Sequence, residues 1–375
     1  MITSGLNTFV VMLIYGSLML LSFLTAVNPL KVNKKANYWF GAFLFLWSTF
    51  WMDEIALYIG FDEVIHNSTV LVHFIQFFTP IVFYFSIVFY TNPDYRFRIA
   101  DLKYLILPAI YIFFLIVNQM QGSDIQRFTQ ILLLSLILAQ VILYTILSYL
   151  EIRKHKKKIL AFASNTVEID LSWLEYIISS ILLLSIVVTL YNIFFNATTL
   201  NVFINIFLLL IIFFIAYNSL KQKEIFPLDK NMRKEIISIE DESQSGELKK
   251  KIIPDSDLIK FKTKLIELIS IEKPYLDSEL NLIKLAELIN ITPHQLSYII
   301  NTGFNENFFQ FINTYRVEKA KELLVKEEMN KLSILGIAFE SGFNSKTSFN
   351  TTFKKITGQT PSEFKKRSSA YSLNP

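Results

Sequence analysis

Two series of polar side chains in the C-terminal third of this 375-residue chain share one spacing, i, i+3, i+4, i+7. That spacing places the members of a series along one face of a helix. Imidazole, hydroxyl, amide and ammonium groups in such a stripe can hydrogen-bond the edges of DNA bases, so the spacing predicts two helices that read a DNA groove. The first series comprises His294, Ser297, Tyr298 and Asn301, and the second comprises Thr347, Asn350, Thr351 and Lys354.

Basic residues gather around the second series. Between Gly342 and Arg367, six lysines and arginines face one acidic residue, Glu363. Among the six, Lys354 and Lys355 are predicted to contact DNA phosphates, whose charge dominates the affinity of proteins for DNA. The alternative is an ordinary solvated helix face. The first series has no lysine or arginine, so its readout is expected to be weak or to depend on a dimer.

The first series lies in a predicted helix-turn-helix over residues 281–301. A short apolar helix is interrupted at Asn290, and a new helix begins directly afterwards. Thr292 supplies a hydroxyl cap, Pro293 occupies the first helical position, and Gln295 completes a capping box. Two short helices joined by a tight turn are the helix-turn-helix motif.

The second series lies in a second predicted helix-turn-helix. An amphipathic helix over residues 308–324 is followed by a short helix over 334–338, a turn at Gly342 and a second recognition helix over 344–357. The expected core residues of the second recognition helix are Phe349, Phe353 and Ile356.

Three segments within residues 257–367 resemble the DNA-binding domain of the AraC family of bacterial regulators. They read LIKLAELINITPHQLSYIIN, NFFQFINTYRVEKAKELL and ILGIAFESGFNSKTSFNTTFKKITGQTPSEF. The resemblance implies two helix-turn-helix units joined by one helix, with both recognition helices in successive major grooves. It also implies that bases are contacted by His294, Ser297, Tyr298, Lys346, Thr347, Ser348 and Thr351.

Two positions depart from the family pattern. Asn305 stands where relatives often have glycine, and the turn should survive because asparagine is the next best left-handed residue. Thr351 stands where relatives often have arginine, which removes a candidate guanine reader.

The first 220 residues are far poorer in charge than the rest. Residues 1–220 contain 12 Lys and Arg and 11 Asp and Glu, whereas residues 221–375 contain 24 and 21. The whole chain is 52% apolar and has no cysteine, which excludes disulfides and thiolate metal sites. Seven apolar stretches approach the ~20 residues of a membrane-spanning helix, which predicts a seven-helix bundle in a lipid bilayer. The stretches are Asn7–Val27, Tyr38–Gly60, Val70–Tyr90, Tyr104–Met120, Phe128–Leu150, Leu171–Phe195 and Leu200–Leu220.

The basic residues of the predicted loops alternate between the two sides of the membrane. The loops after the first, third and fifth stretches hold eleven lysines and arginines, whereas those after the second, fourth and sixth hold only Arg127. Cytoplasmic loops are the ones enriched in Lys and Arg. We therefore expect an inner-membrane protein whose N-terminus is outside the cell and whose C-terminal domain is in the cytoplasm.

A few polar groups within the predicted stretches share a depth in the outer leaflet. They are Asp53, Glu54, His73 and Gln76. Ionisable groups within membrane spans are rare and often functional, so one interpretation is a ligand pocket open to the outside. The alternative is that these groups hydrogen-bond neighbouring helices or reach water, with a structural role only.

These patterns predict an all-α protein of three parts. Residues 1–220 form the membrane region, 221–254 a cytoplasmic linker, and 255–375 the AraC-type DNA-binding domain. The predicted function is a membrane-tethered one-component transcription regulator. Its expected partners are double-stranded DNA, the lipid bilayer, an unknown small-molecule or membrane signal, and, as an open alternative to a monomer, a second copy of the chain.

No enzyme activity and no cofactor are expected, because no metalloprotease helix, nucleophile elbow or phosphate-binding loop occurs in the sequence. The rival interpretation is a membrane transporter or enzyme with a regulatory DNA-binding tail. A transporter should combine repeated halves with interrupted helices. Repeated halves are not apparent, although Pro80 and Pro108 could interrupt two of the helices.

Overall fold

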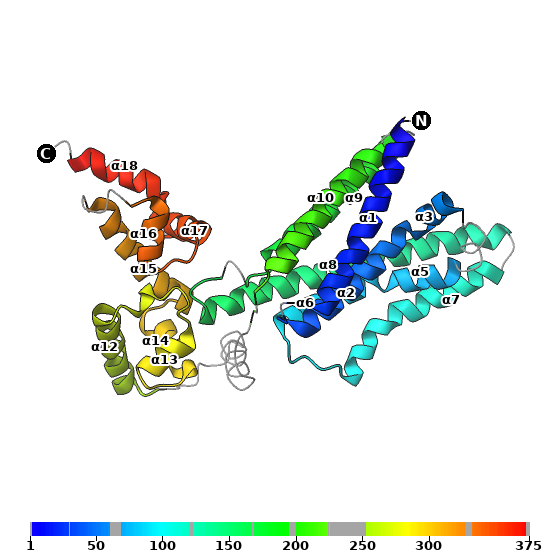
Figure 1. The fold of residues 1–375 in the computed structure, drawn as a ribbon. Coiled ribbons are helices and arrows are strands. Elements are labelled where there is room, and N and C mark those ends of the chain that lie inside the picture. The colour runs from blue at the N-terminus through cyan, green and yellow to red at the C-terminus, as the bar shows by residue number, and fades with distance from the viewer. Residues whose placement is uncertain are drawn as a thin grey trace. The chain divides into compact units, whose positions relative to one another are not determined.

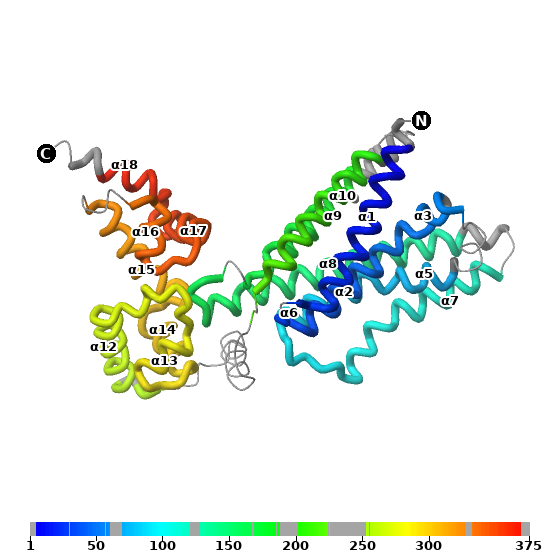
Figure 2. Tube along the Cα trace, in the orientation of Figure 1, coloured from blue at the N-terminus to red at the C-terminus, as the bar shows by residue number. Residues whose placement is uncertain are grey.

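The computed structural model describes residues 2–29, 31–60, 69–120, 123–166, 169–194, 200–223, 225, 253–326 and 332–372. Within these ranges every regular element is an α-helix or a 3-10 helix, which confirms the predicted all-α class. The predicted linker over residues 221–254 lies almost wholly outside them. Figure 2 follows the described trace in colour.

The chain divides into two compact units. The first, here called the apolar unit, comprises Met1–Lys154 and Leu171–Ile225. The second, the C-terminal unit, comprises His155–Asp170 and Phe226–Pro375. Residues 155–170 thus group with the C-terminal unit, although the sequence analysis had placed them in the predicted membrane region. The helix α8 (Ser123–Phe162) contributes residues to both units.

The apolar unit is built from helices along its whole described length. Its elements besides α8 are α1 (Ile2–Val27), α2 (Lys34–Ser48), η1 (Thr49–Trp51), α3 (Met52–Ile59), α5 (Thr69–Phe77), α6 (Thr79–Thr91), η2 (Ile99–Leu105), α7 (Ile106–Met120), α9 (Ser172–Phe194) and α10 (Leu200–Lys221).

Five helical stretches among the described residues are long and apolar enough to cross a membrane. They are Gly5–Val27, Val70–Thr91, Ile99–Met120, Phe128–Phe162 and Val202–Lys221. Seven had been predicted. The stretch expected over 38–60 is divided by η1 into two short helices, and the one expected over 171–195 shows a shorter apolar helix, Ser172–Leu184. Many apolar side chains of these helices are exposed on the surface of the unit; Phe9, Phe23 and Phe213 are examples.

Close packing of α1 on α2 depends on a glycine. A Cβ atom added at Gly41 would lie 2.9 Å from both the Ser22 carbonyl oxygen and the Thr25 hydroxyl oxygen. The Ser22 hydroxyl donates to the Gly41 carbonyl at 2.8 Å. Small residues at a helix–helix contact, with a hydroxyl that hydrogen-bonds across it, are the packing mode of membrane helices.

Two neighbouring apolar segments are interrupted. The segment 34–59 passes through the 3-10 turn η1. The segment 69–91 is interrupted between α5 and α6, and Pro80 is the second residue of α6. Proline cannot donate the backbone hydrogen bond of a continuing helix, which explains the second interruption. The interruption expected at Pro80 is therefore present.

The C-terminal unit places two helix-turn-helix motifs at the two ends of one helix. The joining helix is α15 (Phe308–Val325), and Figure 1 shows the first motif in yellow and the second in orange. The first motif is α13 (Leu282–Leu288) and α14 (Pro293–Gly303), and the second is α16 (Ile334–Glu340) and α17 (Lys346–Thr357). The remaining elements are α12 (Asp255–Ile271), η3 (Pro274–Leu276) and α18 (Pro361–Ser372).

The second motif has a continuous aromatic and aliphatic core. Phe343, Phe349 and Phe353 pack together with Ile337 and with α15. The prediction that Ile356 is a core residue is wrong, since its side chain is 40% exposed. Thr352 is buried instead, because it lies three residues after Phe349 and four after Ser348, both of which are buried on the packed side of α17.

Candidate functional site

The first recognition helix, α14, begins as its sequence predicts. The Thr292 hydroxyl accepts from the Gln295 backbone N–H at 3.2 Å, and the Gln295 side chain accepts from the Thr292 N–H at 3.0 Å. Leu296 and Ile300 anchor the helix in the core. On the opposite side, His294 and Tyr298 are half-buried and Asn301 is exposed. These three residues form the accessible part of the first predicted stripe.

The second recognition helix, α17, is capped by Ser345, whose hydroxyl accepts from the Ser348 backbone N–H at 3.1 Å. The helix ends at Gly358 in a left-handed conformation, with φ of +78°. Most of the predicted contact residues are accessible on its surface. Lys346, Thr347, Thr351, Lys354 and Lys355 are exposed, and Asn350 is half-buried.

Two of the predicted base readers face inward. Ser297 is 4% exposed and Ser348 is 5% exposed. The predicted outward position of Ser297 is therefore wrong, and Ser348, which the resemblance implies is a base contact, is buried. At 100° per residue, Ser297 lies only about 60° around the helix from the core residue Ile300, which places it at the edge of the buried face. Its hydroxyl accepts from the Asn301 side-chain amide at 3.3 Å.

Lysines beside the first motif bond protein carbonyls. On α12, the Lys262 ammonium donates to the Gly303 carbonyl at 2.6 Å, and the Lys264 ammonium donates to the Ile289 carbonyl at 3.1 Å. These carbonyls close α14 and α13, where the helix dipole is negative and a cation is stabilising. Since α14 itself contains no Lys or Arg, the lysines exposed on the two recognition helices are those of α17.

A buried arginine on α15 ties the unit together. Arg316 is 1% exposed, and its guanidinium donates to the carbonyls of Tyr275 at 2.7 Å and Asp277 at 2.8 Å. Burial lowers the pKa of Arg316 to about 10, so it remains charged at neutral pH. Arg316 was not among the predicted functional residues, although its spacing indicated a buried position: it stands on the same helix face as Ile312 and Ala320.

The same arginine binds the segment 155–170. Arg316 donates to the Ser164 carbonyl at 3.2 Å and to the Ser164 hydroxyl at 3.0 Å. The side-chain amide of Asn313 also donates to the Ser164 carbonyl, at 3.0 Å, and Ser164 in turn donates to the Leu280 carbonyl. This contact, here called the Ser164 dock, had no signal in local spacing because its partners are about 150 residues apart in the chain.

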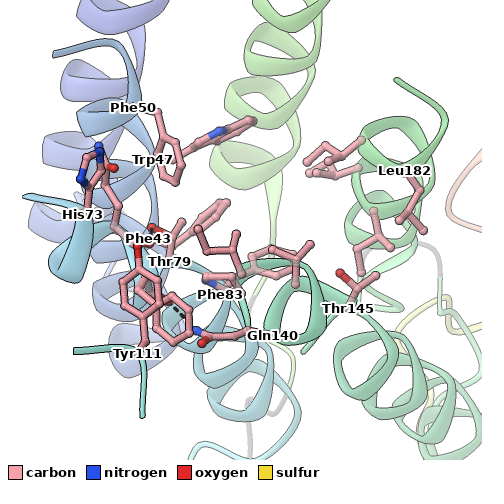
Figure 3. A pocket seen from close by; sticks show the side chains of 18 residues that line it. Phe43, Trp47, Phe50, His73, Thr79, Phe83, Tyr111, Gln140, Thr145 and Leu182 are labelled. Atoms are coloured by element: carbon pink, nitrogen blue, oxygen red, sulfur yellow. Dashed lines mark hydrogen bonds between the residues drawn. The ribbon is translucent and has the colours of Figure 1, made fainter. Parts of the chain in front are cut away.

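The four polar residues predicted near the outer leaflet separate into two places. Glu54 accepts from the side chains of Asn7 at 3.2 Å and Tyr58 at 3.1 Å, and Asp53 is exposed. His73 and Gln76 line a cavity within the apolar unit, to which neither acidic residue contributes (Figure 3). The four groups therefore do not form one site.

Comparison with known proteins identifies the C-terminal region. Residues 285–367 match the model of a helix-turn-helix domain family, which confirms the AraC-type resemblance over this region. A Staphylococcus aureus protein named as an uncharacterized HTH-type transcriptional regulator is 38% identical over 88 residues. A second relative, an uncharacterized HTH-type transcriptional regulator in the cgkA 5' region of Pseudoalteromonas carrageenovora, is 31% identical over 96 residues.

Both matches are partial. The first covers 23% of this chain and 11% of the Staphylococcus protein, and the second covers 26% of this chain and 54% of its relative. The chain thus aligns with about a tenth of the length of the first relative. No solved structure matches the chain. The C-terminal region is a helix-turn-helix domain of the kind found in transcriptional regulators.

Proposed function

We propose that this chain is a membrane-tethered transcription regulator that binds specific double-stranded DNA through α14 and α17. One observation carries the proposal: a double helix-turn-helix domain and five helices suited to a bilayer occur in one polypeptide. A signal received by the membrane region would then control DNA binding in the same molecule. Such a protein needs no separate kinase or receiver.

The orientation of the protein follows from charge. If the chain crosses the membrane seven times, as its sequence predicts, eleven of the twelve loop lysines and arginines lie on the side of the membrane that carries the C-terminal domain. By the positive-inside rule, that side is the cytoplasm. The DNA-binding domain would thus have access to the chromosome while it remains attached to the inner membrane.

The Ser164 dock supports a route for the signal. Residues 155–162 are the last two turns of α8, and residues 163–164 contact α15 and the start of α13. Arg316 and Asn313, which hold Ser164, lie on the helix that joins both motifs. A displacement of the end of α8 would therefore act directly on the spacing of the two recognition helices. Dimerisation of the chain is the second route, and the two can act together.

The full-length chain tests this proposal in cells. With one epitope at each terminus, we expect an impermeant reagent to label only the N-terminal epitope of intact cells. Chromatin pull-down on the C-terminal epitope should recover a limited set of sequences from the membrane fraction. A matched variant, Lys354→Ala with Lys355→Ala, should keep the labelling pattern and lose the DNA. Labelling of the C-terminal epitope on intact cells, or pull-down without enrichment, would contradict the proposal.

The transporter alternative gains one supporting observation, the two interrupted segments at η1 and at Pro80. Interrupted helices occur in transporters, where they form the substrate site, but they also suit any ligand site within a bundle. Transport assays with the same double lysine variant separate the two. A transporter would keep its transport when the DNA contacts are removed.

A further inference from the structure

The apolar unit contains a cavity of about 380 Å³, within the range of small-molecule sites. Its wall is contributed by α2, η1, α5, α6, α7, α8 and α9. Figure 3 shows the rings of Phe43, Trp47, Phe83 and Tyr111 around it, with Gln140 and Thr145 on the α8 side. The wall is therefore mostly aromatic and aliphatic, with a few polar groups.

The cavity lies where the two interrupted segments meet. The missing N–H of Pro80 leaves carbonyls of the preceding turn without a helical donor. The Thr79 hydroxyl donates to the Gln76 carbonyl at 2.7 Å, and the Gln140 amide donates to the Phe77 carbonyl. Gln76 in turn donates to the Thr49 carbonyl of η1 at 3.0 Å. Both breaks are thus held by cavity-lining side chains, as irregular backbone within a bilayer requires.

One polar atom at this place has no partner. Gln140 is 1% exposed, and its side-chain oxygen makes no hydrogen bond in the described structure. Leaving a buried acceptor unpaired is costly, so such an atom points to a donor that the chain does not supply. Gln140 is also one of the residues that line the cavity.

The described lining residues include no Asp, Glu, Lys or Arg. Apart from His73, a charged ligand would therefore meet no side chain that could compensate its desolvation, which is strongly unfavourable. We propose that the cavity binds a neutral, largely apolar molecule that carries one hydroxyl or N–H group, and that this group donates to the Gln140 side-chain oxygen. The apolar body of the ligand packs against Trp47, Phe83 and the aliphatic residues of α9.

The assignment of this cavity as the signal input rests on the proposed function, whereas the binding itself does not. A ligand here contacts both interrupted segments and also α8, the helix that continues to the Ser164 dock. Binding at the breaks can alter the bend of those segments, since a short 3-10 stretch within a helix is a frequent hinge.

Tryptophan fluorescence of the full chain in phosphatidylcholine nanodiscs tests the proposal. The probes are bromoundecanol, which has a hydroxyl donor and a quenching bromine, and bromoundecane, which has only the bromine. We expect saturable quenching of Trp47, with bromoundecanol binding about 2- to 10-fold more tightly, the effect of one neutral hydrogen bond. The saturable component should disappear in Trp47→Phe.

The matched variants are Gln140→Leu and Gln130→Leu, which make the same change on one helix. Gln130 is exposed and is not among the lining residues. Gln140→Leu should abolish the preference for the alcohol, and Gln130→Leu should keep it. Equal affinity for both probes, quenching that never saturates, or a preference that survives Gln140→Leu would overturn the proposal. DNA binding in the same nanodiscs is scored separately, so its persistence leaves the proposed function intact when the cavity fails.

Discussion

The two helix-turn-helix motifs use one backbone device and differ in the residues that carry it. Each turn contains a left-handed residue, Asn290 with φ of +56° in the first motif and Gly342 with φ of +86° in the second. In each, the N–H of the next residue donates to a carbonyl five positions earlier, Ala286 in one and Ala338 in the other. The same turn geometry is thus reached with a side chain at one turn and without one at the other.

The reason for the glycine is space. A Cβ atom at Gly342 would lie 2.3 Å from the Tyr275 carbonyl oxygen and 3.2 Å from the Arg316 Nε. The second turn therefore packs directly on Tyr275, whose carbonyl also accepts from Arg316, the residue that binds Ser164. The second motif therefore differs from the first in that the backbone of its turn packs directly on η3, next to the Arg316 side chain of the joining helix.

The recognition helices differ in charge as well. α14 contains no Lys, Arg, Asp or Glu, whereas α17 contains Lys346, Lys354 and Lys355. We therefore expect a division of labour, in which the second motif supplies most of the attraction to phosphate and the first adds base contacts through His294 and Tyr298.

The largest expected effect comes from the cores. Phe349→Ala in the second motif should cost ~3–5 kcal/mol of folding free energy, and Leu296→Ala in the first should cost ~2–5 kcal/mol, because both side chains are fully buried. Denaturant unfolding followed by circular dichroism measures both. If each substitution leaves the other motif folded, the two motifs are independent; joint unfolding would show that α15 couples them.

The turns should respond unequally to the same substitution. Gly342→Ala should destabilise the domain by more than ~2 kcal/mol, because it adds a left-handed penalty of ~1–2 kcal/mol to a collision with the Tyr275 carbonyl. Asn290→Ala should cost only ~1 kcal/mol. Thermal melts of the two variants provide the comparison. Equal losses would mean that the backbone contact at Gly342 is unimportant.

Base readers on the two helices should change sequence preference rather than overall affinity. Thr347→Ala on α17 and Tyr298→Phe on α14 are expected to shift discrimination among sites by ~1–3 kcal/mol where a good contact is lost. Ser297→Ala and Ser348→Ala should alter preference little, because both hydroxyls are buried. Selection from a randomised DNA pool measures this, and an opposite ranking would contradict the observed faces of the helices.

Phosphate contacts should give the smallest and most uniform effect. Lys354→Ala and Lys355→Ala should each weaken binding to all sequences alike and reduce the salt dependence by about one ion. Lys321→Ala is the matched control, because Lys321 pairs with Glu318 at 2.6 Å on α15. The slope of log affinity against log salt should be unchanged in that control.

Local features of the fold were predictable from sequence, and distant ones were not. The cap at Thr292 and the turn at Gly342 depend on residues a few positions apart, so spacing identifies them. The inward turn of Ser297 depends on how far the core extends around a helix. Spacing alone does not give that extent.

The residues of the apolar unit show the same limit. Asp53 and His73 were predicted to share a depth, but depth does not specify which side of a helix faces a cavity. Gln140, which binds the Phe77 carbonyl between α5 and α6, is 63 residues away from it in the chain. The Ser164 dock on Arg316 spans 152 residues and is likewise a product of tertiary packing.

The central claim is that the two unequal motifs together bind DNA, and salt-dependent DNA binding tests it most directly. Fluorescence anisotropy of labelled duplex DNA would be recorded with the full chain in nanodiscs across a salt series, with circular dichroism as the folding control. We predict a linear fall of log affinity with log salt, with a slope that decreases when Lys354 and Lys355 are replaced. A folded chain that shows no salt-dependent binding, either alone or as an enforced dimer, would contradict the account.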